Sequence, residues 1–121
     1  MHSTVKRFYI CTMNIDNTKA QMRKGLLELL VLAVLRKEQE AYVNVILEKL
    51  KEKEIIVVEG TIYPLLTRLK NEGYIKHRWV ESTEGPPRKY YQLTDEGSAM
   101  LDQLKQAWDD ISKTVNTILN N

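Results

Sequence analysis

The side chains best suited to chemistry lie in residues 59–72, where small, hydroxyl-bearing and cationic groups share one face of an expected helix. Apolar residues recur at helical spacing along the opposite edge: Ile62, Leu65, Leu66 and Leu69. The polar face holds Gly60, Thr61, Tyr63, Pro64, Thr67, Arg68 and Asn71. Such groups suit a nucleic-acid groove, because small residues allow close approach, hydroxyls bond phosphates or bases, and arginine can bind guanine through two hydrogen bonds. An ordinary solvated helix face has a similar composition, so this face alone leaves both interpretations open.

Pro64 is unexpected in this helix, because it removes a backbone donor and disfavours a helical conformation at Tyr63. Past the first turn, a proline costs roughly 3 kcal/mol where nothing compensates. It falls on the side away from Ile62 and Leu66. The proline is therefore expected on the polar face of the helix, beside Tyr63, rather than on its apolar edge.

A second cationic cluster surrounds the turn-forming stretch STEGPP at residues 82–87. Residues 74–81 alternate apolar and polar side chains, and residues 88–93 return as a second strand, which predicts a β-hairpin. Its cations are Lys76, Arg78, Arg88 and Lys89. Cations in such a hairpin contact phosphates without reading sequence, although they also discourage aggregation of an edge strand. Because the polar face of residues 59–72 accompanies them, we favour phosphate contact.

The most regular periodicity lies near the C-terminus, where one seam of apolar residues alternates spacings of three and four. Its members are Leu101, Leu104, Trp108, Ile111, Val115 and Ile118. The segment is shorter than a free-standing coiled coil, and residues 19–36 are apolar on nearly all sides, including Leu29. Both features predict one interface with a second copy of the chain. Trp108 either fills this interface or lines a pocket between subunits.

The expected helices and strands position these side chains. Helices are expected at residues 19–36, 41–53 and 59–72, with an extended link at residues 55–58. The hairpin follows, and Thr94 is expected to cap a helix that runs to about residue 119. The fold class is therefore mainly α with a β-hairpin: a winged helix-turn-helix domain at residues 19–93, after a loose N-terminal extension at residues 1–18. Residues 94–121 form the C-terminal dimerisation helix.

The composition argues against an enzyme or a metal protein. The chain has two histidines, His2 and His77, and one cysteine, Cys11, without partners at ligand or catalytic spacing. No glycine-rich phosphate loop is present. We therefore expect no catalytic residues, no metal site and no cofactor.

Charge is unevenly distributed along the 121 residues. Residues 1–93 carry 16 of the 18 Lys and Arg and 11 of the 16 acids, a balance of +5, whereas residues 94–121 have a balance of −3. A basic body suits nucleic acid. The single cysteine indicates a reducing compartment, and the longest apolar run, residues 29–35, is too short to cross a bilayer. These features predict a cytoplasmic protein.

Two motifs carry a family resemblance over residues 20–119. The runs GTIYPLLTRLKNEGYI and GPPRKYYQLTDEG, after a leucine-rich helix, resemble PadR-type transcriptional regulators, and the short chain is similar to the small subfamily that includes a lactococcal multidrug-binding repressor. The resemblance implies a recognition helix containing Thr61, Tyr63, Pro64 and Arg68, and a wing with Arg88 and Lys89. It also implies that residues 94–121 mediate dimerisation and that Trp108 can stack on flat aromatic ligands. The chain departs from that repressor at Ser112, where the repressor has an acid.

Together these patterns predict a homodimeric winged-helix repressor that binds a palindromic operator on double-stranded DNA. A small aromatic ligand at Trp108 would release the DNA. The main alternative is a winged-helix module for protein contact that does not bind DNA, and this module would show no salt-dependent DNA binding.

Overall fold

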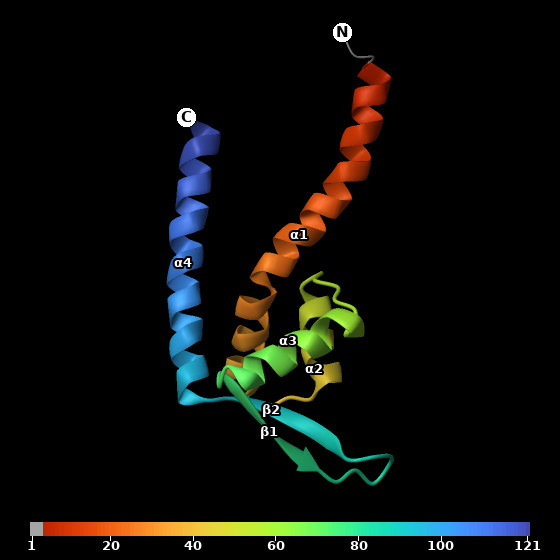
Figure 1. Cartoon of the computed structure of the whole chain (residues 1–121), viewed down its shortest axis with the longest axis vertical. Coiled ribbons are helices and arrows are strands. Elements are labelled where there is room, and N and C mark those ends of the chain that lie inside the picture. Colours follow the sequence, from red (N-terminus) through yellow and green to blue (C-terminus); the bar gives the residue numbers. More distant parts are fainter. Residues whose placement is uncertain (1–3) are drawn as a thin grey trace.

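The computed structural model describes residues 4–121, and side chains from residue 15 onward. It contains four helices and one hairpin within that range: α1 (Thr4–Glu38), α2 (Val43–Glu52), α3 (Glu59–Asn71), β1 (Ile75–Val80), β2 (Arg88–Leu93) and α4 (Asp95–Asn120). Helices α1 and α4 are long rods that lie together at the base and diverge toward their free ends (Figure 1). The predicted fold class, mainly helical with a β-hairpin and a long C-terminal helix, is confirmed.

The hydrophobic core lies where α2 and α3 pack against the C-terminal half of α1. Leu32 and Leu35 from α1, Ile46 from α2, and Ile62 and Leu66 from α3 are each at most 1% exposed. Complete burial of such a side chain stabilises the fold by roughly 1.5–3 kcal/mol. The apolar edge predicted for α3 therefore holds the helix against the domain and leaves its other face at the surface.

Helix α1 begins at Thr4, so the prediction of a loose extension over residues 1–18 is corrected for residues 4–18; residues 1–3 lie outside the described part. No glycine or proline interrupts residues 4–24. A helix already formed by buried residues extends with one hydrogen bond per added residue, at little free-energy cost. Residues 15–25 are exposed along this projecting part.

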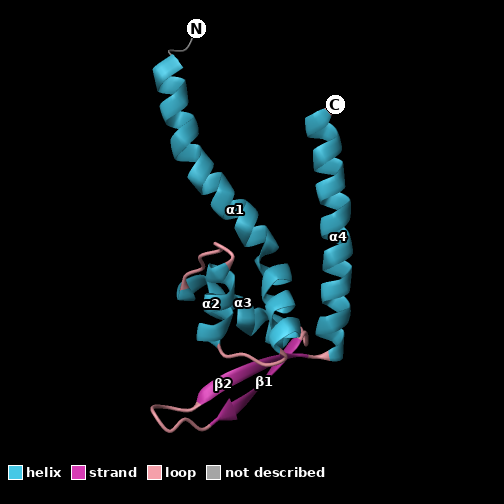
Figure 2. Ribbon diagram, turned by 180° about the vertical axis from the view of Figure 1, so that it is seen from behind, coloured by secondary structure: helices cyan, strands magenta, loops and turns pink. Residues whose placement is uncertain are grey.

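The hairpin is antiparallel, with register from Ile75 opposite Leu93 to Val80 opposite Arg88. A bridge adds Ala41 to its edge, through hydrogen bonds from Ala41 N to Tyr91 O at 3.1 Å and from Tyr91 N to Ala41 O at 2.8 Å. This bridge fixes the hairpin to the α1–α2 connection. The hairpin passes beneath α2 and α3, and its turn points away from α4 (Figure 2).

Helix α4 begins as its sequence predicts. The Thr94 hydroxyl oxygen accepts a hydrogen bond from Gly97 N at 3.0 Å, and the hydroxyl donates to Gly73 O at 2.6 Å. Gly97 is buried against Tyr74, in the connection between α3 and β1, and a Cβ there would run into the Tyr74 carbonyl oxygen. Among the residues that the structure describes, no helix has the length and apolar content to cross a membrane.

Candidate nucleic-acid interface

The polar face of α3 is exposed in the structure. Tyr63, Pro64, Thr67 and Asn71 lie at the surface, and with Arg68 they line a shallow depression. Thr61 lies apart from them, half-buried at the edge of α3 beside Leu27 and the 55–58 link. The predicted face is therefore one surface centred on Tyr63, Pro64 and Thr67, with Thr61 at its margin.

Pro64 lies within a continuous helix. The N–H groups of Thr61 and Ile62 both hydrogen-bond to Val58 O, at 3.0 and 3.2 Å, and the helix continues to Asn71. Pro64 has no N–H to offer the Gly60 carbonyl one turn earlier. Gly60 and Pro64 are both exposed, so water can satisfy this carbonyl. The proline thus falls on the surface face, as its spacing predicted, without interrupting the helix.

Arg68 is engaged by two carboxylates. Its guanidinium lies 3.4 Å from Glu28 Oε2 on α1, and it donates to both oxygens of Glu72 at 3.2 and 3.3 Å. Burial opposes its charged form, but the hydrogen bonds to Glu72 and Glu28 outweigh burial and raise the pKa of Arg68 above its ordinary value. Arg68 therefore ties α3 to α1 and can reach another anion only by leaving these partners.

Arg78 is also bound by a carboxylate. Its guanidinium donates twice to Glu40, at 2.7 and 2.6 Å, and Gln92 donates to the same carboxylate at 2.8 Å. The Arg78 hydrogen bond holds the pKa of Glu40 below its usual value. Sequence reasoning grouped Arg78 with the phosphate-contacting cations, but in this structure its charge is balanced within the chain.

Arg88 and Lys89 have aromatic neighbours instead. The Arg88 guanidinium carbon lies 4.5 Å from the centre of the Tyr42 ring, and Lys89 Nζ lies 5.2 Å from the Trp79 ring. Within the part of the chain whose side chains are described, neither cation forms an ion pair. Their charges are therefore available to an external anion.

A groove of about 390 Å³ joins the two predicted clusters. Tyr63 and Thr67 of α3 line one side, and Arg88 and Lys89 line the other. Its remaining lining comes from the start of α2 and from the hairpin: Tyr42, Val43, Asn44, Trp79, Pro87 and Tyr91. Sequence reasoning missed Tyr42, Asn44 and Trp79. The hairpin register, which places Trp79 opposite Lys89, was the signal that could have found Trp79.

Side chains that could bind a metal ion do not cluster within the described part of the chain. Among the described residues, no three His, Cys, Asp or Glu side chains are placed to hold a metal ion. His2 and the side chain of Cys11 lie outside the described part. His77 packs against Trp79 and Tyr91, and burial lowers its pKa, helped by the charges of Lys70 and Lys89.

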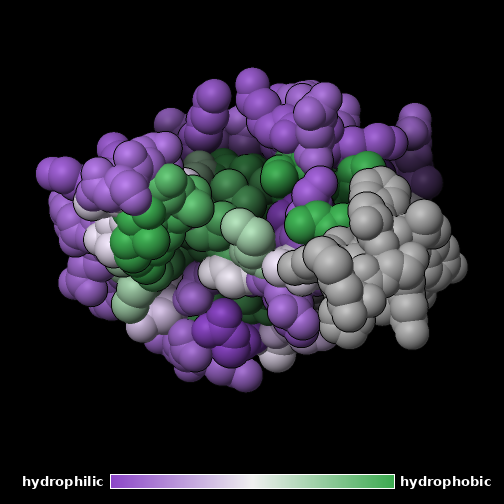
Figure 3. All heavy atoms as spheres, turned by 90° about the horizontal axis from the view of Figure 1, so that it is seen from above, coloured by the Kyte–Doolittle hydropathy of each residue, from purple (hydrophilic) through white to green (hydrophobic). Residues whose placement is uncertain are grey.

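The apolar seam predicted on α4 divides into two parts. Leu101 is only 4% exposed and belongs to the core of this chain, while Leu104 and Leu29 pack against that core. Farther along α4, Trp108, Ile111, Val115 and Ile118 are 43–71% exposed. Viewed from above, apolar surface gathers around a hollow between α4 and α1 (Figure 3). Leu101 is therefore not free to meet a partner, whereas the C-terminal part of the seam is.

Comparison with known proteins identifies the family. Residues 31–103 match the PadR-like transcriptional regulator family. A PadR-like transcription factor from Bacteroides fragilis is 55% identical, with a TM-score of 0.71 over 84% of this chain and 98% of the other. A PadR family regulator from Eggerthella lenta is 30% identical, with a TM-score of 0.85 over 92% and 96% of the two chains.

Two further relatives are similar to this chain. A PadR-like regulator from Bacillus cereus is 40% identical, with a TM-score of 0.72 over 84% of this chain and 98% of its own. A curated relative from Lysinibacillus sphaericus is 27% identical over 63 residues, and the match spans 52% of this chain and 58% of that relative. Members of the matched family regulate transcription and are not enzymes, as the missing catalytic groups predicted. The chain belongs to the PadR-like family of transcriptional regulators.

Proposed function

We propose that this chain is a DNA-binding repressor that acts as a homodimer on a palindromic operator. The observation that carries the proposal is the groove in which Tyr63 and Thr67 of α3 face the uncompensated cations Arg88 and Lys89. A helix with small and hydroxyl groups suits the major groove, and a neighbouring cationic hairpin suits the phosphate backbone. Occlusion of a promoter by this complex would repress the gene.

Each half-site would be read by the exposed face of α3. Tyr63, Pro64 and Thr67 would approach the duplex most closely, and Thr61 would meet the backbone at the edge of the contact. Arg68 would contribute by exchanging Glu28 and Glu72 for DNA. Arg88 and Lys89 would add affinity but little sequence preference, because they contact phosphates.

A second copy of the chain is the proposed partner for the exposed end of α4. Trp108, Ile111 and Val115 form an apolar stripe that the protomer leaves uncovered. Two α4 helices related by a twofold axis would cover each other there, with Leu29 and Leu104 at the margin. Such symmetry places two copies of α3 on half-sites about 34–36 Å, or a multiple of this distance, apart.

The test is a mobility shift with the protein's own upstream DNA at two salt concentrations. Binding should weaken as salt rises, because the cations replace counterions on the duplex. Arg88→Gln should reduce this salt dependence, whereas Lys105→Gln on α4, an exposed cation outside the groove, should not. Binding that is absent, or independent of salt and of Arg88, would favour the protein-contact module instead.

Trp108 supports a ligand site as a second part of this proposal. It is the aromatic residue in an otherwise aliphatic exposed stripe, and at 43% exposure its ring can be reached by a flat aromatic molecule. A Trp79→Phe variant leaves Trp108 as the remaining tryptophan. Flat aromatic compounds should quench its fluorescence and weaken operator binding together. If titration changes neither signal, the chain is a regulator without such a ligand.

A further inference from the structure

The cations of the interface are held in two different ways. Arg68 and Arg78 are held by carboxylates, which accept several of their hydrogen bonds and balance their charge; Arg78 also lies 6.0 Å from the centre of the Tyr90 ring, but Glu40 already balances its charge. Arg88 and Lys89 lie over aromatic rings. An aromatic face attracts a cation through its quadrupole but accepts no strong hydrogen bond from it. A ring can therefore position a cation and leave its N–H donors and its charge free for a phosphate.

From this difference, and resting on the proposed function, we propose that Trp79 and Tyr42 are positioning residues for a phosphate-binding site formed by Arg88 and Lys89. Trp79 orients Lys89 and Tyr42 orients Arg88, so that both cations meet the sugar-phosphate backbone of the DNA strand that runs through the groove beside Tyr63 and Thr67. The ligand is thus one segment of duplex backbone, bound without regard to base sequence.

The pairing of Trp79 with Lys89 is built into the hairpin. The two residues are directly opposite each other in the antiparallel register, so their side chains share one face of the sheet. Trp79 is 62% exposed, although tryptophan is usually well buried. Its outer surface contributes little to the core, and it lines the groove together with Lys89. Its contact with Lys89 explains why Trp79 lies at the surface.

Tyr42 supports Arg88 from the other side of the hairpin. Its ring lies 5.2 Å from that of Tyr90, and this neighbour limits its movement. Tyr42 also precedes α2 directly, so the Arg88 guanidinium is held next to the start of that helix. A side chain that is already ordered loses less conformational freedom on binding, and preorganised cations therefore bind a phosphate more tightly than free ones.

A double-mutant cycle tests the proposal with full-length protein and its own upstream duplex. Lys89→Gln should reduce the slope of log affinity against log salt by about 0.9 for each phosphate contact that is lost. Trp79→Ala should weaken binding about two- to fivefold, the range expected for an exposed cation–π contact. In the Lys89→Gln background, Trp79→Ala should have no further effect. Trp79→Phe, which keeps a ring, should bind as the parent does.

The controls separate positioning from a loss of structure. Lys76 is an exposed cation on the other face of β1, so Trp79→Ala should have its full effect in a Lys76→Gln background. A disrupted hairpin would weaken binding in every background and would lower the thermal midpoint. If Trp79→Ala has the same effect with and without Lys89, or if Lys89→Gln leaves the salt slope unchanged, the positioning proposal is wrong while DNA binding stands. If the parent protein binds no duplex, the proposed function itself fails.

Discussion

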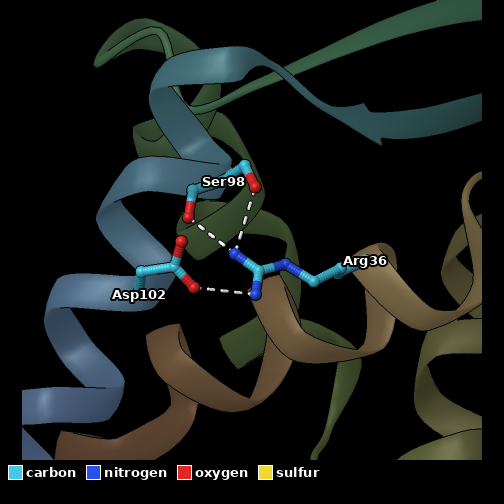
Figure 4. Close-up of polar contacts among 3 residues, drawn as sticks. All are labelled: Arg36, Ser98 and Asp102. Carbon is cyan, nitrogen blue, oxygen red and sulfur yellow. Dashed lines mark hydrogen bonds and ion pairs between the residues drawn. The ribbon is translucent and has the colours of Figure 1, made fainter.

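The guanidinium of Arg36, near the end of α1, donates a hydrogen bond to the carboxylate of Asp102 on α4 at 2.9 Å (Figure 4). The same guanidinium donates to the backbone carbonyl of Ser98 at 2.7 Å and to the Ser98 hydroxyl at 3.0 Å. These three bonds join the end of α1 to the first turns of α4, at the base where the two helices lie together (Figure 1). They hold the proposed dimerisation helix at a set angle to the domain that carries α3.

Arg36→Met should destabilise the fold more than Asp102→Asn. The first substitution removes all three hydrogen bonds and should lower the free energy of unfolding by about 1 kcal/mol. The second removes the charge of one partner and leaves an amide oxygen that can still accept the hydrogen bond; the two side chains are 41% and 67% exposed, where an ion pair contributes about 0–1 kcal/mol and commonly little. Urea unfolding of both variants measures the difference. Equal losses would mean that the ion pair, rather than the bonds to Ser98, fixes the junction.

Gly97→Ala should destabilise the same junction strongly. A Cβ at Gly97 meets the backbone of Tyr74, which cannot move as a flexible side chain can. Overpacking of this kind typically costs about 1–3 kcal/mol. Gly25→Ala is the matched control, because it makes the same change in an exposed helix with nothing within 4 Å. This control should stabilise the protein by up to about 1 kcal/mol, since alanine favours helix over glycine. Thermal unfolding should show shifts of opposite sign.

Ile111→Glu and Val115→Glu should abolish the proposed dimer without unfolding the protomer. Both side chains are largely exposed in the protomer, at 58% and 46%, so a carboxylate there remains hydrated in the single chain. Burial of that carboxylate in an apolar contact between two α4 helices is strongly unfavourable. Thr117→Glu, which adds the same side chain away from the stripe, should remain dimeric. Sedimentation equilibrium measures the outcome, and a parent protein that is monomeric would contradict the proposed dimer.

Local sequence signals predicted the elements of the fold well. Thr94 caps α4, Gly73 adopts a positive φ of 84° after α3, and Ile62 and Leu66 mark the buried edge of α3. Each signal depends on residues within one or two turns of each other. The start of α1 was predicted too late, because residues 4–18 lack the apolar periodicity of a packed helix although they contain no helix breaker.

The electrostatics of the interface could not be predicted in the same way. The five cations that the sequence places on the polar face of α3 and on the hairpin looked equivalent, yet Glu40 binds Arg78 across 38 residues and Glu28 binds Arg68 from α1. Local patterns do not report such distant partners. Leu101 shows the same limit, because its heptad position did not reveal that α1 of its own chain buries it.

His77 should make the folded state more stable at neutral than at mildly acidic pH. Its pKa is lowered from 6.5 in the folded protein, first by burial and then by Lys70 and Lys89. Below about pH 6.5 the unfolded chain therefore binds a proton more readily than the native one, and the free energy of unfolding decreases as the pH is lowered. His77→Gln should flatten the unfolding free energy between roughly pH 7.5 and 5.5.

Glu40 affects the stability of the fold at a lower pH than His77 does. Its pKa is held below 4.5 chiefly by the hydrogen bond from Arg78, so its contribution is present above pH 4.5 and is lost as pH falls through the lowered value. Glu40→Gln should therefore change the acid limb and leave the slope near neutrality intact. A neutral slope that persists in His77→Gln would show that another group titrates there.

Glu28→Gln should strengthen DNA binding if Arg68 leaves its carboxylates to contact the operator. In the free protein Arg68 is held by Glu28 and Glu72, and each exposed ion pair contributes roughly 0.2–1 kcal/mol. Release of one pair should therefore raise affinity by roughly 1.4- to fivefold, and Arg68→Met should lower it. Loss of a negative charge near DNA could also raise affinity directly, so the deciding measurement is Glu28→Gln in an Arg68→Met background. An effect that disappears there assigns it to the released guanidinium. An effect that persists would leave Arg68 as a tie between α3 and α1, with Tyr63 and Thr67 as the groups that meet the duplex.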